Sequence, residues 1–231
     1  METIRVELLA DLPDALVELG LTRTMPTLAS VGAASGLTGT DSTSLETLFE
    51  ELTKIADRRG AAVVDGGTDR GVMRLFGRAR SRGYGFPLLG VAVDELVALP
   101  GSESDDGRCP LEPNHTHAVL VPGEAWGEEA PWLARVATLL ADQAPSVTVL
   151  VNGGEIAYAD AEASIAEGRP VVVAAGSGGT ADVVAAAARG ASTLERAQAL
   201  ADSELVRAVD LNEDAGRQLA TEIERILSEW S

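Results

Sequence analysis

The chain has 231 residues, of which 45% are hydrophobic and 3% aromatic, and its 18 basic against 36 acidic residues give a net charge of −18. A hydrophobic share of this size in a chain of this length can build a substantial core, which excludes disorder throughout. Because a phosphate backbone requires Lys and Arg on the face that binds it, the charge argues against a nucleic-acid polymer or an anionic membrane surface as partner.

The chain has a single cysteine, Cys109, so an intramolecular disulfide and a cysteine-based zinc site are both excluded. The first residues are acidic, whereas a secretory signal peptide begins with basic residues. The longest apolar stretches, such as residues 171–175, are far shorter than the roughly 18 residues that a membrane-spanning helix needs. We therefore expect a cytoplasmic protein with no membrane-spanning segment.

Short β-branched apolar runs, each leading into glycines or other turn residues, recur along the chain and predict strands. The runs with their turns occupy residues 27–34, 61–67, 87–93, 117–122, 146–154 and 170–179. Because several runs are continuously apolar rather than alternating, we expect strands that are buried on both faces. A further strand at residues 4–9 and a helix at residues 13–19 are expected before them.

Segments with helical periodicity separate these runs. They cover residues 44–59, 72–82, 131–143, 158–167 and 181–189. A last helix runs to Trp230, with Asp210 or Asn212 as its expected N-cap. One face of this helix carries Leu219, Ile223, Ile226 and Leu227.

The alternation of strands and helices predicts βαβ units, and hence an α/β protein with a mostly parallel sheet and helices on both faces. No Pro-, Ser- or Gly-rich linker divides the chain, so we expect one domain over residues 1–231. Its core is expected at about residues 26–190, with a C-terminal strand and helix at 203–230. Residues 100–113 are expected to form a loop, and Trp126, Trp132 and Trp230 to be packing residues.

Four glycine clusters fall where predicted strands lead into helices, at residues 32–39, 66–71, 153–154 and 176–180. In a parallel sheet, ligands bind beyond the carboxyl ends of the strands. Glycine allows close approach of the backbone, and the N-terminus of the following helix favours an anion. Although turn formation alone explains one such cluster, four at equivalent positions predict a phosphate-bearing ligand. We expect one crevice with a local positive potential on an otherwise acidic surface.

Several polar side chains near these clusters have two interpretations. Arg70 could bind a phosphate or pair with a neighbouring carboxylate, and Asp182 could cap a helix or accept a bond from a ribose hydroxyl. His115 and His117 could form an acid/base or metal pair, but no third ligand stands at a diagnostic spacing, so we expect hydrogen-bonded structural histidines and no metal site. Cys109 is assigned no role.

Three segments together resemble a known family. They are residues 60–72 (GAAVVDGGTDRGV), 114–117 (NHTH) and 170–182 (PVVVAAGSGGTAD). In sequence and order they resemble the cytoplasmic N-terminal region of TRPM channels. The chain is thus similar to a stand-alone prokaryotic relative of that module, within the SLOG superfamily of nucleotide-ligand sensors. The resemblance extends over about residues 26–182.

This resemblance implies a Rossmann-like three-layer fold and a sensor or binding domain for a nucleotide-derived ligand. ADP-ribose is the leading candidate, followed by another NAD-derived metabolite or a mononucleotide. No resident cofactor is implied, and a sensor of this kind would act through a separate effector protein or through its own homo-oligomer. The residues expected to contact the ligand are Gly32, Ser35, Gly66, Gly67, Thr68, Asp69, Arg70, Gly71, His117, Gly153, Gly154, Glu155, Gly176, Ser177, Gly178, Gly179, Thr180 and Asp182.

The same superfamily includes the LOG phosphoribohydrolases, which cleave the N-glycosidic bond of nucleoside monophosphates. Their second motif reads Gly-Gly-x-Gly-Thr-x-x-Glu, and here Ile156 and Ala157 replace its inner Gly and Thr while Asp160 replaces its Glu. These departures argue against glycosidic hydrolysis. The alternative function is nevertheless a hydrolase of nucleotides or of NAD, in which Glu155, Asp160 or Glu162 acts as acid or base.

Overall fold

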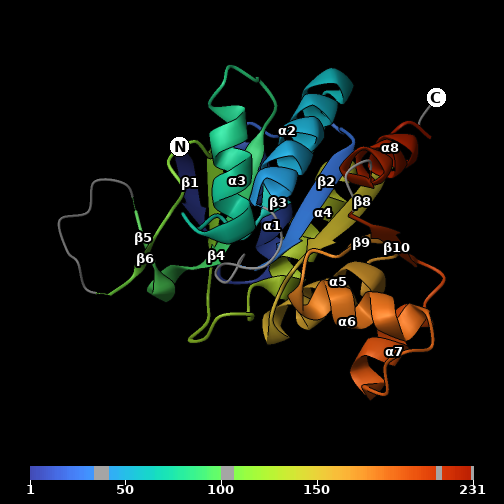
Figure 1. Cartoon of the computed structure of the whole chain (residues 1–231). Helices are drawn as coiled ribbons and strands as arrows, with labels where there is room; N and C mark the ends of the chain where they lie inside the picture. Colours follow the sequence, from blue (N-terminus) through green and yellow to red (C-terminus); the bar gives the residue numbers. More distant parts are fainter. Residues whose placement is uncertain (34–41, 100–106, 212–214, 230–231) are drawn as a thin grey trace.

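The computed structural model describes residues 1–33, 42–99, 107–211 and 215–229 (Figure 1). Its centre is an eight-stranded sheet with the order β1-β7-β4-β3-β2-β8-β9-β10, in which all neighbouring strands are parallel. The strands are β1 (Glu2–Arg5), β2 (Thr27–Gly32), β3 (Ala62–Asp65), β4 (Leu88–Val93), β7 (His117–Val121), β8 (Ser146–Val151), β9 (Val171–Ala175) and β10 (Val206–Asp210).

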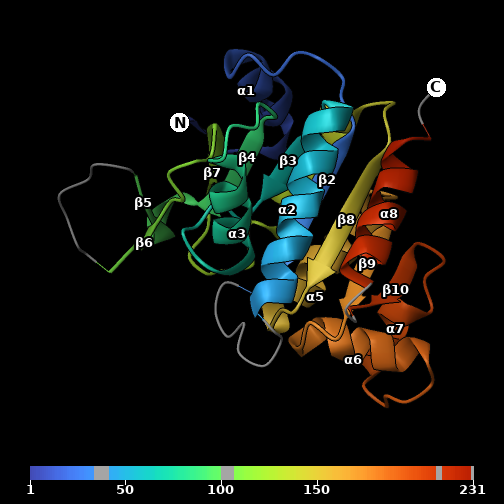
Figure 2. The same cartoon turned by 45° about the horizontal axis from the view of Figure 1, so that its top comes forward.

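Helices cover both faces of the sheet and complete three layers, which confirms the predicted Rossmann-like α/β fold (Figures 1 and 2). On one face lie α1 (Leu12–Glu18), α4 (Ala130–Ala141), α5 (Glu155–Ala166), α6 (Gly179–Ala188) and α7 (Glu195–Ala201). On the other face lie α2 (Ser42–Arg59), α3 (Gly71–Arg80) and α8 (Ala215–Leu227). In both views α2 and α8 run side by side over the sheet.

The continuous apolar runs form these strands because their successive side chains enter two different cores. In β3, Val63 packs under α2 and α3 while Val64 packs on the opposite face. In β8, Val149 and Leu150 divide in the same way, and all four side chains are fully buried. A strand between two helical layers thus has no solvent-facing side that would require polar residues.

Two expectations for the ends of the chain need correction. The N-terminal strand covers Glu2–Arg5 rather than residues 4–9, and it pairs with β7 at the edge of the sheet. Asp210 is the last residue of β10 and not the N-cap of the final helix. The alternative cap, Asn212, lies outside the described residues, as does Trp230.

The segment expected to be a loop at residues 100–113 contains a short strand in its described part. This strand, β6 (Cys109–Pro110), pairs in parallel with β5 (Val97–Ala98), and the two form a small separate sheet. The backbone of Leu111 also donates to the carbonyl of Ala98. Strands of two residues cannot be predicted from hydrophobic periodicity, because a period needs at least two repeats.

The sheet reverses its direction of growth at β2. From β2 the chain adds β3, β4 and β7 on one side, whereas β8 returns to pair with the other side of β2 and is followed by β9 and β10. A crevice forms at such a switch point, since the loops that leave neighbouring strands turn to opposite faces. Within the described residues, no helix is long and apolar enough to cross a membrane.

Candidate functional site

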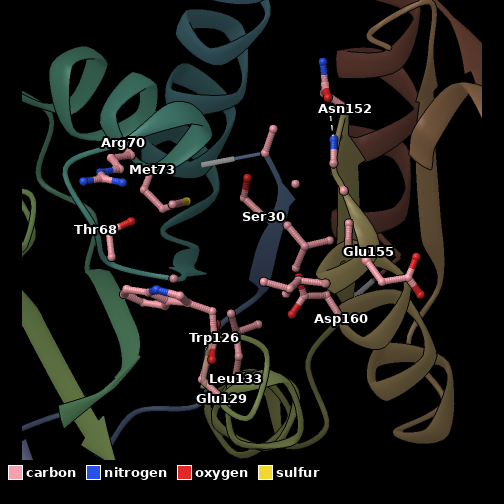
Figure 3. A pocket seen from close by; sticks show the side chains of 18 of the residues that line it. Ser30, Thr68, Arg70, Met73, Trp126, Glu129, Leu133, Asn152, Glu155 and Asp160 are labelled. Atoms are coloured by element: carbon pink, nitrogen blue, oxygen red, sulfur yellow. Dashed lines mark hydrogen bonds between the residues drawn. The ribbon is translucent and has the colours of Figure 1, made fainter. Parts of the chain in front are cut away.

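A pocket of about 420 Å³ opens at this switch point, beyond the carboxyl ends of β2, β3 and β8 (Figure 3). The described residues that line it are Ser30, Val31, Gly32, Ala33, Gly66, Thr68, Arg70, Met73, Cys109, Trp126, Glu129, Leu133, Asn152, Gly153, Gly154, Glu155, Ile156, Ala157 and Asp160. Three of the four predicted glycine clusters therefore contribute to one pocket. The position follows from topology, because these segments are far apart in the sequence and meet only through strand order.

On one side of the pocket, the segment after β3 turns into α3. Arg70 is the N-cap of α3, with an extended backbone, and its exposed guanidinium makes no ion pair with any described residue. Thr68 is buried beside it, and Met73 lies in the first turn of the helix. A guanidinium at a helix N-terminus is a suitable partner for a phosphate, because the helix dipole adds to its charge.

The opposite side consists of the loop after β8 and the first turn of α5. Asn152 has a left-handed backbone (φ 57°), and its side-chain carbonyl accepts a hydrogen bond from the Gly153 amide at 2.7 Å. Gly154 is the N-cap of α5. A second helix thus directs its N-terminus at the pocket, which favours negative charge at this rim.

Two carboxyl groups, Glu129 and Asp160, lie at the inner end of the pocket (Figure 3). Glu129 precedes α4 and accepts a hydrogen bond from the Gly127 amide at 2.7 Å, whereas the Asp160 carboxyl accepts none from the described residues. Burial, with the nearby Glu129 charge, raises the pKa of Asp160 to about 7, and burial also raises the pKa of Glu129. The Asp160 carboxyl therefore tends to hold a proton near neutral pH.

The pocket is more acidic than the sequence predicts. Arg70 is the one basic group among its described lining residues, against Glu129, Glu155 and Asp160. Positive potential is confined to the guanidinium and the two helix N-termini, while the inner end is carboxylic. The expected local positive potential therefore stays a prediction for the end at Arg70, and the pocket has two chemically opposite ends.

Behind the glycines at residues 66–67 lies a buried charged triad. The His115 ring contacts Asp65 through Nε2 at 2.8 Å and Glu112 through Nδ1 at 2.9 Å. Although burial opposes its charge, the two carboxylates raise the pKa of His115 to about 9, so the ring is an imidazolium that donates to both. Asp65 also accepts a bond from the Gly67 amide at 2.8 Å. The triad thus fixes the loop at the pocket wall, a structural role that agrees with the expectation for His115.

The glycine cluster at residues 176–180 does not line the pocket. The amide of Thr180 donates to the Gly153 carbonyl at 2.9 Å, and the next amide of α6 donates to the Asn152 carbonyl at 3.0 Å. Ser177 accepts from the Asn152 amide at 2.7 Å, and Asp182 accepts from the Gly176 amide at 2.5 Å. The N-terminus of α6 therefore binds the neighbouring loop of its own chain, where the sequence predicts a phosphate.

Close packing explains the glycines of this cluster. A Cβ atom at Gly179 (φ 54°) would lie 2.1 Å from the carbonyl oxygen of Gly153, and one at Gly178 would lie 2.9 Å from the amide nitrogen of the Asn152 side chain. Glycine is needed here so that one loop can approach the other. These residues, together with Ser177, Thr180 and Asp182, support the pocket from behind.

The other residues predicted to contact the ligand do not line the pocket among the described residues. Gly67 and Gly71 lie next to lining residues without lining the pocket, and Asp69 pairs with Arg74 at 2.7 Å. His117 begins β7 at the amino end of the sheet, the edge opposite the pocket, because ligand loops leave from carboxyl ends. The structure therefore does not bring His117 to the site. Ser35 lies outside the described residues.

Other residues line the pocket although sequence reasoning assigns them no ligand contact. Trp126, expected to be a packing residue, is 42% exposed and lies in the loop between β7 and α4 together with Glu129. Leu133 follows in the first turn of α4, and Cys109 reaches the pocket from β6. The signal for Trp126 and Glu129 was available, since their loop also follows the carboxyl end of a predicted strand and contains glycines.

Glu155 and Asp160, the predicted catalytic pair, both line the pocket but differ in environment. The Glu155 carboxylate is 80% exposed and pairs with Arg196 of α7, which also binds Glu162 at 2.7 Å. Asp160 is buried and accepts no bond from the described residues. Of the two, only Asp160 has the environment of an acid that can hold a proton. The described residues contain no group of three His, Cys, Asp or Glu that could hold a metal ion.

Comparisons with solved structures agree with this architecture. The chain is similar to the structural-genomics protein TM1055, at 22% identity and a TM-score of 0.58, over 87% of this chain and 100% of the other. It is also similar to the molybdenum cofactor carrier protein of Chlamydomonas reinhardtii, at 17% identity and a TM-score of 0.56, over 90% of this chain and 100% of that protein. At these identities the likeness shows the fold alone.

A search of curated proteins finds no match. The profile of a sequence family, by contrast, matches residues 25–220, which include every strand of the sheet except β1. The family is described as SLOG in TRPM, prokaryote. Since the match covers most of the chain, and includes the pocket and the loops that support it, this protein belongs to the prokaryotic branch of the TRPM-type SLOG family.

Proposed function

We propose that this protein is a binding domain for a nucleotide-derived ligand and that the pocket at the switch point is its site. Family membership supports a nucleotide-related binding or processing domain. The observation that carries the proposal is the geometry of Arg70, a guanidinium without an ion-pair partner among the described residues, at the N-terminus of α3 and facing a second helix N-terminus across the pocket. That arrangement matches a phosphate.

The pocket volume bears on the kind of nucleotide. At about 420 Å³ the pocket is in the lower part of the range of about 300–1,000 Å³ that small-molecule sites occupy. A mononucleotide fits with its phosphate at Arg70 and the rest of the molecule directed towards Glu129 and Asp160. ADP-ribose and NAD are longer and require that part of the ligand extend out of the mouth, past Glu155.

The test is calorimetry with a panel of AMP, nicotinamide mononucleotide, ADP-ribose, NAD and a cyclic dinucleotide. At least one compound should bind, and Arg70→Ala should weaken its binding about tenfold or more, because a charge-assisted phosphate contact is lost. Arg78→Ala is the matched control, since Arg78 is an exposed arginine in the last turn of the same helix. Absence of binding by every compound would refute the proposal.

A second candidate function is hydrolysis of an N-glycosidic bond, and one observation favours it. Asp160 occupies the position of the motif glutamate, lines the pocket, and has a pKa raised to about 7, as a general acid requires. Prolonged incubation with a bound nucleotide should then release free base, and Asp160→Asn should abolish this release while Glu162→Gln on the outer side of α5 should not. Intact nucleotide after such an incubation would exclude hydrolysis and leave ligand binding as the proposed function.

As a sensor, the domain would pass ligand occupancy to a separate effector protein or to a second copy of itself, in the cytoplasm. The loop at residues 123–129 is the element best placed to respond, because it contributes Trp126 and Glu129 to the pocket and leads directly into α4. Light scattering with and without saturating nucleotide distinguishes the two routes: a change in mass would indicate a homo-oligomer, and an unchanged mass an external effector.

A further inference from the structure

The inner end of the pocket has an excess of hydrogen-bond acceptors. Between them, Glu129 and Asp160 carry four carboxyl oxygens. Among the described residues, the backbone amides of Gly127 and of Glu129 itself donate to the Glu129 carboxyl, and none donates to that of Asp160. Both residues are only 8% exposed, and both line the pocket. A ligand group placed here must bring hydrogen-bond donors or positive charge, because phosphate or another anion would be repelled.

In the part of the chain that the structure describes, no cation is positioned to neutralise this pair. The charged and titratable groups around the pocket are Arg70 of α3, Cys109 of β6 and Glu155 of α5. Arg196 lies on the outer side of α5, where it is occupied by Glu155 and Glu162. The nearest charge that acts on Asp160 is that of Glu129 itself, which is repulsive. In the free protein, a proton on Asp160 therefore reduces the repulsion between the two carboxyl groups.

A ligand cation and a ligand hydroxyl would affect this pair differently. A ligand hydroxyl donates a hydrogen bond to a carboxyl oxygen but does not reduce the repulsion between two carboxylates. The pair would therefore still have to hold a proton. A cation removes the repulsion and allows that proton to leave. Trp126 adds an aromatic surface at the same pocket, and an indole is the side chain that binds organic cations best.

We infer that Glu129 and Asp160, with Trp126, form a subsite for a positively charged aromatic ring on the phosphate-bearing ligand, as in a nucleotide whose ribose is attached to a pyridinium nitrogen. This inference rests on the proposed function and specifies the ligand class of that same pocket. The phosphate at Arg70 and the ring at the carboxyl pair give the ligand a fixed direction. A pocket with these two ends distinguishes the oxidised from the reduced form of a nicotinamide nucleotide, since reduction removes the ring charge.

The test compares two probes that differ in this charge, oxidised and reduced nicotinamide mononucleotide, by calorimetry at about pH 8, above the value of about 7 for the Asp160 pKa. The oxidised form should bind about tenfold more tightly or better. Its binding near pH 7 should also release protons, seen as a dependence of the apparent enthalpy on the ionisation enthalpy of the buffer. AMP, with a neutral ring, should release none.

Variants identify the groups responsible. Glu129→Gln and Asp160→Asn should each reduce the preference for the oxidised form to about twofold or less, while the affinity for the reduced form stays within about threefold of the wild-type value. Glu162→Gln is the matched control, since it neutralises a carboxylate of the same helix outside the pocket. Circular dichroism of each variant confirms that it is folded, and the proton-release measurement on the wild type does not depend on any variant.

The outcomes separate the two proposals. If both forms bind equally, or the oxidised form binds without proton release, the cation subsite is wrong and the nucleotide pocket stands. If neither form binds but another compound of the panel does, the subsite is again wrong. If no nucleotide binds, both proposals fall together.

Discussion

The carboxyl group of Asp160 makes the stability of the free protein depend on pH. Its pKa in the folded chain is about 7 against an ordinary value of 3.8, so the folded state favours the protonated form. The Asp160 carboxyl does not destabilise the fold below about pH 4, where it is protonated in both the folded and the unfolded state. As pH rises towards 7 it increasingly destabilises the folded state. Because Asn resembles the protonated carboxyl, Asp160→Asn should stabilise the protein at pH 8 by roughly 2–4 kcal/mol.

Urea denaturation of Asp160→Asn at several pH values checks this prediction. The difference from wild type should vanish at about pH 4 and grow up to about pH 7. Glu204→Gln, which neutralises an exposed carboxylate, is the control and should show no such growth. A variant that is less stable than wild type at pH 8 would contradict the assigned environment of Asp160.

His115 has the opposite charge and a different pH window. Its pKa is raised from 6.5 to about 9, so its imidazolium contributes stability fully below pH 6.5, and this contribution is lost as pH rises through 9. His115→Gln leaves Asp65 and Glu112 buried without a cation and should cost about 3–5 kcal/mol at pH 7. Urea denaturation should show this loss, together with a flatter pH profile between 6.5 and 9 in the variant. A loss below about 1 kcal/mol would mean that the triad is not charged.

At the residue scale, the sequence identifies single functional side chains more easily than the side chains that lie next to them in the fold. Arg70 and Gly66 are recognisable from the cluster around them, and both line the pocket. Glu129 and Asp160 are 31 positions apart, and only the packing of α4 against α5 brings their carboxyls close enough for the Glu129 charge to raise the pKa of Asp160. The pKa of a carboxyl depends on burial and on such a neighbour, and neither is a property of the local sequence.

At the scale of elements, the contact between α6 and the loop after β8 gives a sharp test. Gly179→Ala places a methyl group 2.1 Å from the Gly153 carbonyl and should both destabilise the fold and weaken nucleotide binding, although Gly179 does not line the pocket. Gly190→Ala is the control, because its φ of 71° is equally unfavourable for alanine but no atom lies within 4 Å of the added carbon. Thermal unfolding and calorimetry should show an effect on binding for Gly179→Ala alone.

The strands and long helices were predictable because burial on both faces requires continuous apolar runs, as in β8 and β9. The group that the N-terminus of α6 binds was not predictable from the sequence. A glycine-rich turn before a helix serves equally to bind a phosphate or a carbonyl of the same chain, since both are acceptors for the same amides. The choice depends on the pairing of β8 with β9, which places the carbonyls of Asn152 and Gly153 at that helix end. Helix α7 was also missed, because at seven residues it has too few turns for a clear periodicity.

For the molecule as a whole, the net charge of −18 affects stability. Like charges repel one another more in the compact state than in the unfolded chain, and salt screens that repulsion. Raising NaCl from about 20 to about 200 mM at pH 7.5 should therefore raise the midpoint of thermal unfolding by about 2–4 °C. The rise should shrink near the isoelectric point, at about pH 4.4, where the net charge is small. A midpoint that falls with salt would show that attractive ion pairs dominate instead.

The position of β1 at the edge of the sheet has a consequence for how the chain assembles. Its partner is β7, so Glu2 pairs with His117, which lies more than a hundred residues later in the chain. During synthesis the first strand emerges from the ribosome long before the strand on which it docks exists. Until then β2, β3 and β4 can pair with one another in the order in which they emerge. Strand β1 is thus made before the rest of the sheet but is among the last strands to be incorporated, and closing so long a loop late makes the docking of β1 a slow step of folding.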